Sequence, residues 1–201
     1  LVDLLKFEPD VYHMNEAHAV SAVFYLLKKF GSREELRKRL VFTTHTPEEA
    51  GNEKHDIHLC HKMSYFNGYS IDEVKKMTGL HDDQFNHSLV ALRFARLSNA
   101  VSELHGHVSR KMWNKHPDTA NIIHITNSQN WKYWADKQLY FAMDEQNEER
   151  FIDRKRYLKK RAFDLVADQT GKLMDPDVLT IVWARRFAGY KRAELITRDK
   201  K

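Results

Sequence analysis

Residues 10–47, DVYHMNEAHAVSAVFYLLKKFGSREELRKRLVFTTHTP, decide the fold class of this chain. The runs at 10–14 and 40–44 are apolar and rich in residues that favour β-strands. Between them, apolar side chains recur at helical spacing and end at Gly31, as they do in a helix with a glycine stop. A strand, a helix and a second strand in this order predict a βαβ unit with parallel strands. We therefore predict an α/β fold.

Capping signals and periodicity extend this pattern along the chain. Ser32 and Ser70 each precede a helical pattern, and Glu35 and Glu73 lie three residues further on, as in a capping box. The remaining periodicity predicts helices over 53–67, 89–97 and 105–113, a strand over 122–126, and either a strand or a turn over 99–104.

The composition changes after residue 127. Residues 129–168 are rich in aromatic and charged side chains and carry no strand signal. Within them, residues 150–168 predict a long helix whose cations form a solvated face. Its inward-facing residues are predicted to be Phe151, Leu158 and Leu165. We place a domain change near residue 127.

Residues 179–192, LTIVWARRFAGYKR, combine an apolar run with a cluster of cations. The run at 179–183 predicts a buried strand, and a helix-like segment begins after Gly189. Arg and Lys side chains between a strand and a helix start can hold an anion such as phosphate. A solvated basic turn beside a core strand is the alternative interpretation.

Bulk composition limits the classes of protein and partner. The 201 residues, 42% hydrophobic and 30% charged, suit one globular domain or parts of two. We find no signal peptide or membrane span, and the single Cys60 fits a reducing compartment, so we expect a cytoplasmic protein. Since residue 1 is Leu, we expect a position inside a longer chain. The net charge of +5 permits an anionic partner without identifying it.

Polar side chains follow each predicted strand. Asn15, Glu16 and His18 follow the first strand, His45 follows the second, and Asn127 follows the third. The carboxyl ends of parallel strands meet at one edge of a sheet, so these groups are expected to gather there. Amide, carboxylate and imidazole groups bind sugar hydroxyls, and the basic turn binds phosphate. The pattern therefore suggests a sugar site next to a phosphate site.

Five segments in collinear order resemble the α-glucan phosphorylases, the glycogen, starch and maltodextrin group, and most closely their bacterial and archaeal branch. The segments are DVYHMNEAHA, VFTTHTPEEAGNE, FARLSNAVSELHGHVSRKMW, HITNSQNW and LTIVWARRFAGYKRAEL. The resemblance implies a glycosyltransferase of GT-B architecture with two Rossmann-like domains. It assigns 1–127 to the second part of the N-terminal glucan-binding domain, 128–178 to a helical interdomain connection, and 179–201 to the first strand and helix of the C-terminal cofactor and phosphate domain.

The resemblance also implies a reaction and its partners. The terminal glucose of an α-1,4-glucan passes to inorganic phosphate with retention, which gives glucose 1-phosphate. The cofactor is pyridoxal phosphate, whose 5′-phosphate takes part in the acid–base work. Its Schiff-base lysine and glycine-rich loop lie downstream in the family, so we expect residues 1–201 alone to lack activity and cofactor. We expect no nucleic-acid or membrane partner, and some self-association through uncovered surfaces.

Site roles transfer position by position. Asn15, Glu16 and His18 match the segment that lines the sugar pocket, and His45 matches the catalytic-site histidine whose backbone carbonyl faces the transferred glucose. The other matches are Asn127 for the amide at the sugar 6-hydroxyl, Arg186 and Lys191 for the cations on substrate and cofactor phosphate, and Tyr190 for a neighbour of that site. This chain departs from the family pattern at Ala17, Glu48, Glu49, Ser128, Gln129 and Gly189. Ala17 and Ser128 replace glycines at tight turns.

Three other functions fit parts of the sequence. A retaining nucleotide-sugar glycosyltransferase of the glycogen or starch synthase kind would share the Arg and Lys pair. A metal-binding or anion-binding module would use the cluster His55, His58, Cys60 and His61, although on a helix these side chains do not share one face, and we predict no metal. Nucleic-acid binding would depend on bulk charge alone.

Overall fold

The computed structural model describes residues 2–185 and 189–198. The chain divides into two compact units, Leu1–Ser128 and Gln129–Lys201, which are described separately.

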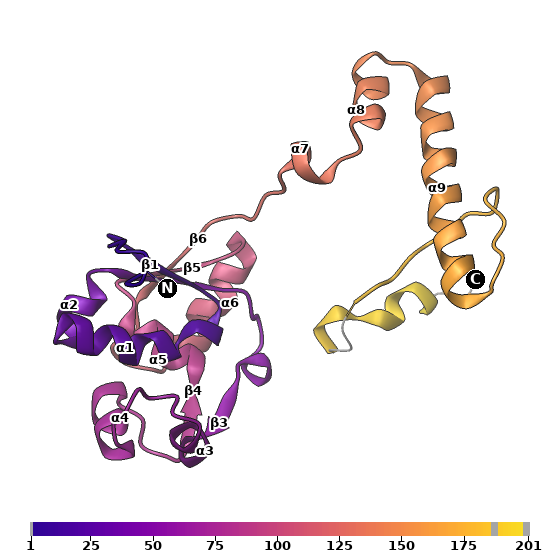
Figure 1. Ribbon diagram of the computed structural model, residues 1–201. Coiled ribbons are helices and arrows are strands. Elements are labelled where there is room, and N and C mark those ends of the chain that lie inside the picture. Colours follow the sequence, from indigo (N-terminus) through magenta and orange to yellow (C-terminus); the bar gives the residue numbers. More distant parts are fainter. Residues whose placement is uncertain (1, 186–188, 199–201) are drawn as a thin grey trace. The chain divides into compact units, whose positions relative to one another are not determined.

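A four-stranded parallel sheet forms the centre of the first unit (Figure 1). Its strands are β1 (Tyr12–Asn15), β2 (Leu40–Thr44), β5 (Leu97–Ala100) and β6 (Asn121–His124), in the order β1-β2-β5-β6. Neighbouring strands are parallel throughout. The predicted α/β fold with parallel strands is therefore confirmed, and it is compatible with a Rossmann-like domain.

The first βαβ unit follows the sequence signals closely. After β1 come a short 3-10 helix, η1 (Ala17–Ala19), and the helices α1 (Ser21–Phe30) and α2 (Arg33–Arg37). Gly31 ends α1 with φ +78°, a left-handed conformation that costs glycine little. The Ser32 hydroxyl accepts a hydrogen bond from the Glu35 backbone N–H at 3.2 Å and starts α2.

Residues 53–67 differ from the predicted single helix. Their first part is β3 (Lys54–Asp56), which pairs antiparallel with β4 (Gln84–Asn86). The helix α3 (Ile57–Lys62) begins after Asp56, whose carboxylate caps the helix by accepting the Leu59 backbone N–H at 2.8 Å. A strand partner 28 or more positions away overrode the local helical periodicity. The next helix, α4 (Ile71–Thr78), carries the predicted Ser70–Glu73 capping box.

The helix predicted through 89–97 is shorter and more buried than expected. It is α5 (His87–Phe94), and all eight of its residues are buried. Leu97 instead begins β5, which runs to Ala100. Of the residues 99–104, for which the sequence left a strand or a turn open, the first two are therefore in a strand. After β5, the Ser102 hydroxyl caps α6 (Glu103–Trp113), and β6 ends at His124, two residues before the predicted end. A helix buried on every side has no polar face to reveal its ends.

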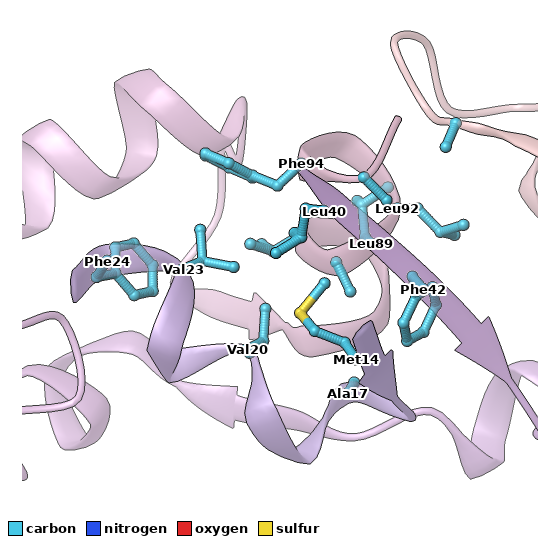
Figure 2. Packing of buried hydrophobic residues seen from close by; sticks show 14 of the residues in the cluster. Met14, Ala17, Val20, Val23, Phe24, Leu40, Phe42, Leu89, Leu92 and Phe94 are labelled. Carbon is cyan, nitrogen blue, oxygen red and sulfur yellow. The ribbon is translucent and has the colours of Figure 1, made fainter. Parts of the chain in front are cut away.

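The hydrophobic core lies between the sheet and its helices (Figure 2). Met14 and Phe42 contribute from β1 and β2, and Val23 and Phe24 contribute from α1. Leu89, Leu92 and Phe94 cover the same core from α5. This packing holds β1 and β2 in register, so that Asn15 lies beside Thr43 and Thr43 lies beside Asn99 in one row across three strands.

The second unit is helical. Its helices are α7 (Trp131–Trp134), α8 (Lys137–Asp144) and α9 (Glu148–Thr170), followed by the 3-10 turns η3 (Gly189–Lys191) and η4 (Ala193–Thr197). The long helix predicted over 150–168 is present, and it is slightly longer. Its inward residue is Phe163, whereas Leu165 is 57% exposed, so the inward placement of Leu165 was wrong.

The strand predicted over 179–183 does not form in the structure. Leu179, Ile181 and Val182 are 84%, 69% and 78% exposed, and their backbone is irregular. The N–H and C=O groups of a strand need a neighbouring strand, and the described part of this unit offers none. The helix expected after Gly189 is likewise reduced to η3 and η4. Among the described residues, no helix combines the length and apolarity that a membrane span requires.

Candidate functional site

Asn15, Glu16 and His45 meet at the carboxyl edge of the parallel sheet. Asn15 is the last residue of β1, and His45 comes directly after β2. The His45 ring donates from Nε2 to the Asn15 side-chain oxygen at 2.6 Å. The two adjacent strand ends thus present one coupled pair of an imidazole and an amide, both exposed to solvent.

Glu16 joins the two strand-end loops. Its carboxylate accepts the His45 backbone N–H and the Thr46 hydroxyl, the latter at 3.3 Å. Its own backbone N–H donates to the Thr43 carbonyl at 2.9 Å, and its φ of +65° is a conformation that favours glycine. Such backbone strain persists only where surrounding contacts hold it. Glu16 therefore lies at the candidate site and also holds the loop that carries His45.

A further polar network joins His13 of β1, Thr43 of β2 and Asn99 of β5. The Thr43 hydroxyl donates to the Asn99 side-chain oxygen at 2.7 Å and accepts from His13 Nε2 at 2.7 Å. The Asn99 amide nitrogen donates to the Ala100 carbonyl at 3.3 Å. The sequence analysis did not single out these three side chains. The signal available was a polar residue one position before the ends of β2 and β5 and two positions before the end of β1, which local periodicity does not distinguish from an outward-facing residue.

His18 and Asn127 lie near this edge without joining the Asn15–His45 pair. The side chain of His18 is 74% exposed, and its Nδ1 atom lies 3.8 Å from a carboxylate oxygen of Glu53. Asn127 is held by its backbone, whose N–H donates to the Val101 carbonyl at 3.0 Å. β6 is separated from β2 by β5, so Asn127 stands at the same edge but two strands away.

His105 is a buried histidine of this edge that the sequence analysis missed. It lies in the first turn of α6, and its Nδ1 atom accepts the Val101 backbone N–H at 3.3 Å. Burial lowers the pKa of His105, while the Thr46 backbone and the Glu16 carboxylate act in the opposite direction. The ring is therefore neutral at pH 7.

A pocket of about 270 Å³ opens beside His18. On its wall, Tyr65 donates from its hydroxyl to His87 Nδ1 at 3.0 Å, and His87 Nε2 lies 2.8 Å from His55 Nδ1. Burial lowers the pKa of His87 to about 4 and raises the pKa of Tyr65 to about 12. Both groups are therefore neutral at pH 7.

The histidine and cysteine cluster at 55–61 is dispersed by the fold. His55 lies in β3 beside His87, while the Cys60 thiol is buried in α3, where burial raises its pKa. His58 instead lies 3.7 Å from Asp83. Within residues 2–185 and 189–198, no group of three or more His, Cys, Asp or Glu side chains is placed to hold a metal ion.

The predicted phosphate residues are only partly described. Arg186 lies outside the described residues, and so does the side chain of Tyr190. Lys191 is the last residue of η3. The described residues around it are exposed coil and single 3-10 turns, which do not enclose a cofactor, so the part of this segment that is described does not fit pyridoxal phosphate by itself.

Comparison with known proteins finds phosphorylases among the relatives. The chain is 31% identical over 247 residues to the maltodextrin phosphorylase of Thermococcus litoralis, covering 99% of this chain and 30% of that protein. It is 29% identical over 256 residues to the glycogen phosphorylase of Aquifex aeolicus, covering 99% of this chain and 37% of that protein.

An uncharacterized protein of Methanocaldococcus jannaschii is 40% identical over 190 residues, covering 94% of this chain and 36% of its own length. The chain thus spans about a third of the length of the curated relatives it matches. Comparison with models of protein families finds no match.

Proposed function

We propose that this chain carries the glucan-binding side of an α-glucan phosphorylase, a glycosyltransferase that moves the terminal glucose of an α-1,4-glucan to inorganic phosphate. The product is glucose 1-phosphate with retained configuration. The observation that carries the proposal is the contact set of Asn15, Glu16 and His45 at the carboxyl edge of the sheet. Similarity to glycogen and maltodextrin phosphorylases along 99% of the chain supports it.

The chemistry of this edge suits an uncharged polyhydroxylated ligand. Asn15 and His45 supply amide and imidazole groups that donate and accept hydrogen bonds, and the exposed His18 lies beyond them. We assign Asn127 to a hydroxyl at the far side of the same sugar. Bound in this way, a glucose unit would be oriented by polar groups at the ends of separate strands, each held by the sheet.

His45 has a second proposed role through its backbone. Its carbonyl would face the anomeric carbon and stabilise the positive charge that develops there as the glycosidic bond breaks. Because the Glu16 carboxylate accepts the His45 N–H, the peptide before that carbonyl is held from one side. Glu16 would thus keep the carbonyl aimed while the substrate changes geometry.

The phosphate side of the reaction is proposed from the resemblance. Arg186 and Lys191 would hold the substrate and cofactor phosphates, with Tyr190 as their neighbour. We also propose the GT-B division into 1–127, 128–178 and 179–201.

The reaction itself provides the first test. The intact gene product is incubated with maltoheptaose and inorganic phosphate, and glucose 1-phosphate is measured. We expect glucose 1-phosphate to form only when phosphate is present, at a rate that saturates as the maltoheptaose concentration rises. Release of a nucleoside diphosphate from nucleotide-activated glucose, with no glucose 1-phosphate, would instead identify a nucleotide-sugar glycosyltransferase.

A variant pair tests the assigned residues. Glu16→Gln removes a charged hydrogen-bond acceptor, and we expect kcat/KM for maltoheptaose to fall by about 10-fold to 100-fold, since such a bond contributes about 1.5–3 kcal/mol. Glu34→Gln changes an exposed carboxylate in α2 and should leave kcat/KM unchanged. Equal activity in the two variants would contradict the role of Glu16.

A further inference from the structure

His105 stands at the junction of the loops that carry the proposed site residues. It is 7% exposed, and its Nδ1 atom accepts the Val101 backbone N–H at 3.3 Å. Since Nδ1 accepts and the ring is neutral, the proton is on Nε2. That Nε2 atom is buried, and among the described residues it makes no hydrogen bond of ordinary geometry. A buried donor without a partner costs about 1–3 kcal/mol, so its placement calls for an explanation.

The first link leads from His105 to Asn127. Val101 donates its N–H to His105 Nδ1, and its carbonyl accepts the Asn127 N–H at 3.0 Å. One residue earlier, the Ala100 carbonyl accepts the Ile125 N–H at 2.9 Å. The imidazole therefore holds the residue on which the backbone of Asn127 rests.

The second link leads to the loop after β2. The Thr46 backbone and the Glu16 carboxylate both raise the pKa of His105, against the effect of burial. Thr46 directly follows His45, and its hydroxyl is held by that same carboxylate at 3.3 Å. Because Nδ1 accepts the Val101 N–H, Nε2 is the ring nitrogen that remains for a contact with this loop.

We propose that His105 is a positioning residue that sets the spacing between the His45 loop and Asn127, with Nδ1 holding Val101 and the Nε2 proton directed towards the Thr46 backbone. It touches no reacting atom. This inference rests on the proposed function, in which His45 and Asn127 contact the same sugar from strand ends that are two strands apart.

Two conservative variants separate the two nitrogens of the ring. Asn at position 105 places an amide group near the position of Nδ1, and Gln places one near the position of Nε2. His105→Leu keeps most of the volume and removes both. The matched control is His107→Leu, which changes an exposed histidine two residues further along the same helix.

The first measurement needs no catalysis. In ¹⁵N–¹H spectra of the chain without ligand, His105→Leu should shift the backbone amides of Val101 and Asn127, and His105→Asn should restore them. His107→Leu should leave both amides unchanged. Unshifted amides of Val101 and Asn127 in His105→Leu would overturn the positioning role, whatever the reaction of the protein is.

The second measurement uses phosphorolysis of maltoheptaose by the intact gene product. We expect His105→Leu to lower kcat by about 10-fold to 100-fold, as a displaced site residue does, with KM for phosphate changed by less than about twofold. His105→Asn or His105→Gln should recover part of kcat, whereas loss of activity that tracks only loss of folded protein would contradict the proposal. Shifted amides together with no phosphorolysis by the unchanged protein would refute the proposed function and leave the positioning role intact.

Discussion

The two units of this chain obtain their order in different ways. In the first unit, a continuous core of buried apolar side chains joins the sheet to α1, α5 and the helices around them. In the second unit, the described residues bury only Ala142 and Phe163 among their apolar side chains, although α9 is the longest helix of the described chain. Local signals are thus sufficient to predict a helix, whereas a tertiary core is needed to place side chains for chemistry.

Capping and ion pairs do most of the ordering in the second unit. Asn147 accepts the Arg150 N–H at 2.9 Å at the start of α9, and Gly171 ends the helix with φ +70°. Arg154 of α9 donates twice to the Asp136 carboxylate, at 3.0 and 2.6 Å, and so joins α9 to the start of α8. These contacts are close in sequence and at most partly buried, so they specify conformation with little burial.

The largest expected difference between the units is in the cost of a cavity. Phe42→Ala removes a fully buried ring from β2, and we expect the free energy of unfolding of the first unit to fall by about 3–5 kcal/mol. Phe163→Ala in α9 should cost no more than about 2 kcal/mol, since its surroundings bury little. Hydrogen exchange measured by mass spectrometry on peptides from each unit separates the two effects. Equal losses of stability in the two units would contradict the difference in burial between them.

The pH dependence of stability should belong to the first unit. His87 has a folded pKa of about 4 against 6.5 when exposed, so between pH 6.5 and 4 the unfolded chain binds a proton that the folded chain does not. The contribution of His87 is present above pH 6.5 and is lost as the pH falls towards 4, by up to about 3 kcal/mol.

Urea unfolding at a series of pH values measures this contribution. In His87→Leu the slope between pH 6.5 and 4 should be shallower than in the unchanged chain. His61→Leu, at an exposed position of α3, should keep the original slope. If the slopes of all three proteins coincide, His87 is not buried as a neutral group.

Helix caps offer a comparison with the same chemistry in both units. Ser70→Ala removes the capping box of α4, and Asn147→Ala removes the cap of α9, each at a cost of about 1 kcal/mol. In the first unit the loss should lower the stability of the whole core, because α4 belongs to it through the buried Val74. In the second unit it should increase exchange only in the first turns of α9, as hydrogen exchange would report.

The smallest expected effect concerns the ion pair between α8 and α9. Two hydrogen bonds from Arg154 hold the pKa of the Asp136 carboxyl at about 2, against its ordinary 3.8. The contribution of the pair to stability is therefore complete above about pH 4 and is lost as the pH falls to about 2. Arg154→Lys keeps the charge but loses the two-pronged contact, and we expect a small drop in the melting temperature of the helical signal. Added salt should reduce the difference between the two proteins, since the pair is only partly buried and solvent still reaches it. A difference that grows with salt would rule out this ion pair as its cause.

Prediction from the sequence was best where the deciding contacts are local. The extent of β2, the Gly31 stop of α1 and the Ser70 capping box each depend on neighbours within a few residues. Prediction failed at Lys54–Asp56, whose strand depends on β4, and at residues 179–183, whose apolar composition suits a strand although the described part of the second unit contains no strand to pair with. The candidate site was reached through strand ends, which gave Asn15, Glu16 and His45.

By itself the sequence determined the α/β class, the parallel strands and the polar residues that end them, because hydrophobic periodicity and capping are properties of short segments. Only the tertiary structure decided that Glu16 holds the loop of His45, that Thr43 bonds Asn99, and that His105 is buried beneath the edge. Those contacts join residues from 29 to 56 positions apart or depend on burial by several elements. No local pattern encodes them, since they exist only once parallel strands are in register and packed on a common core.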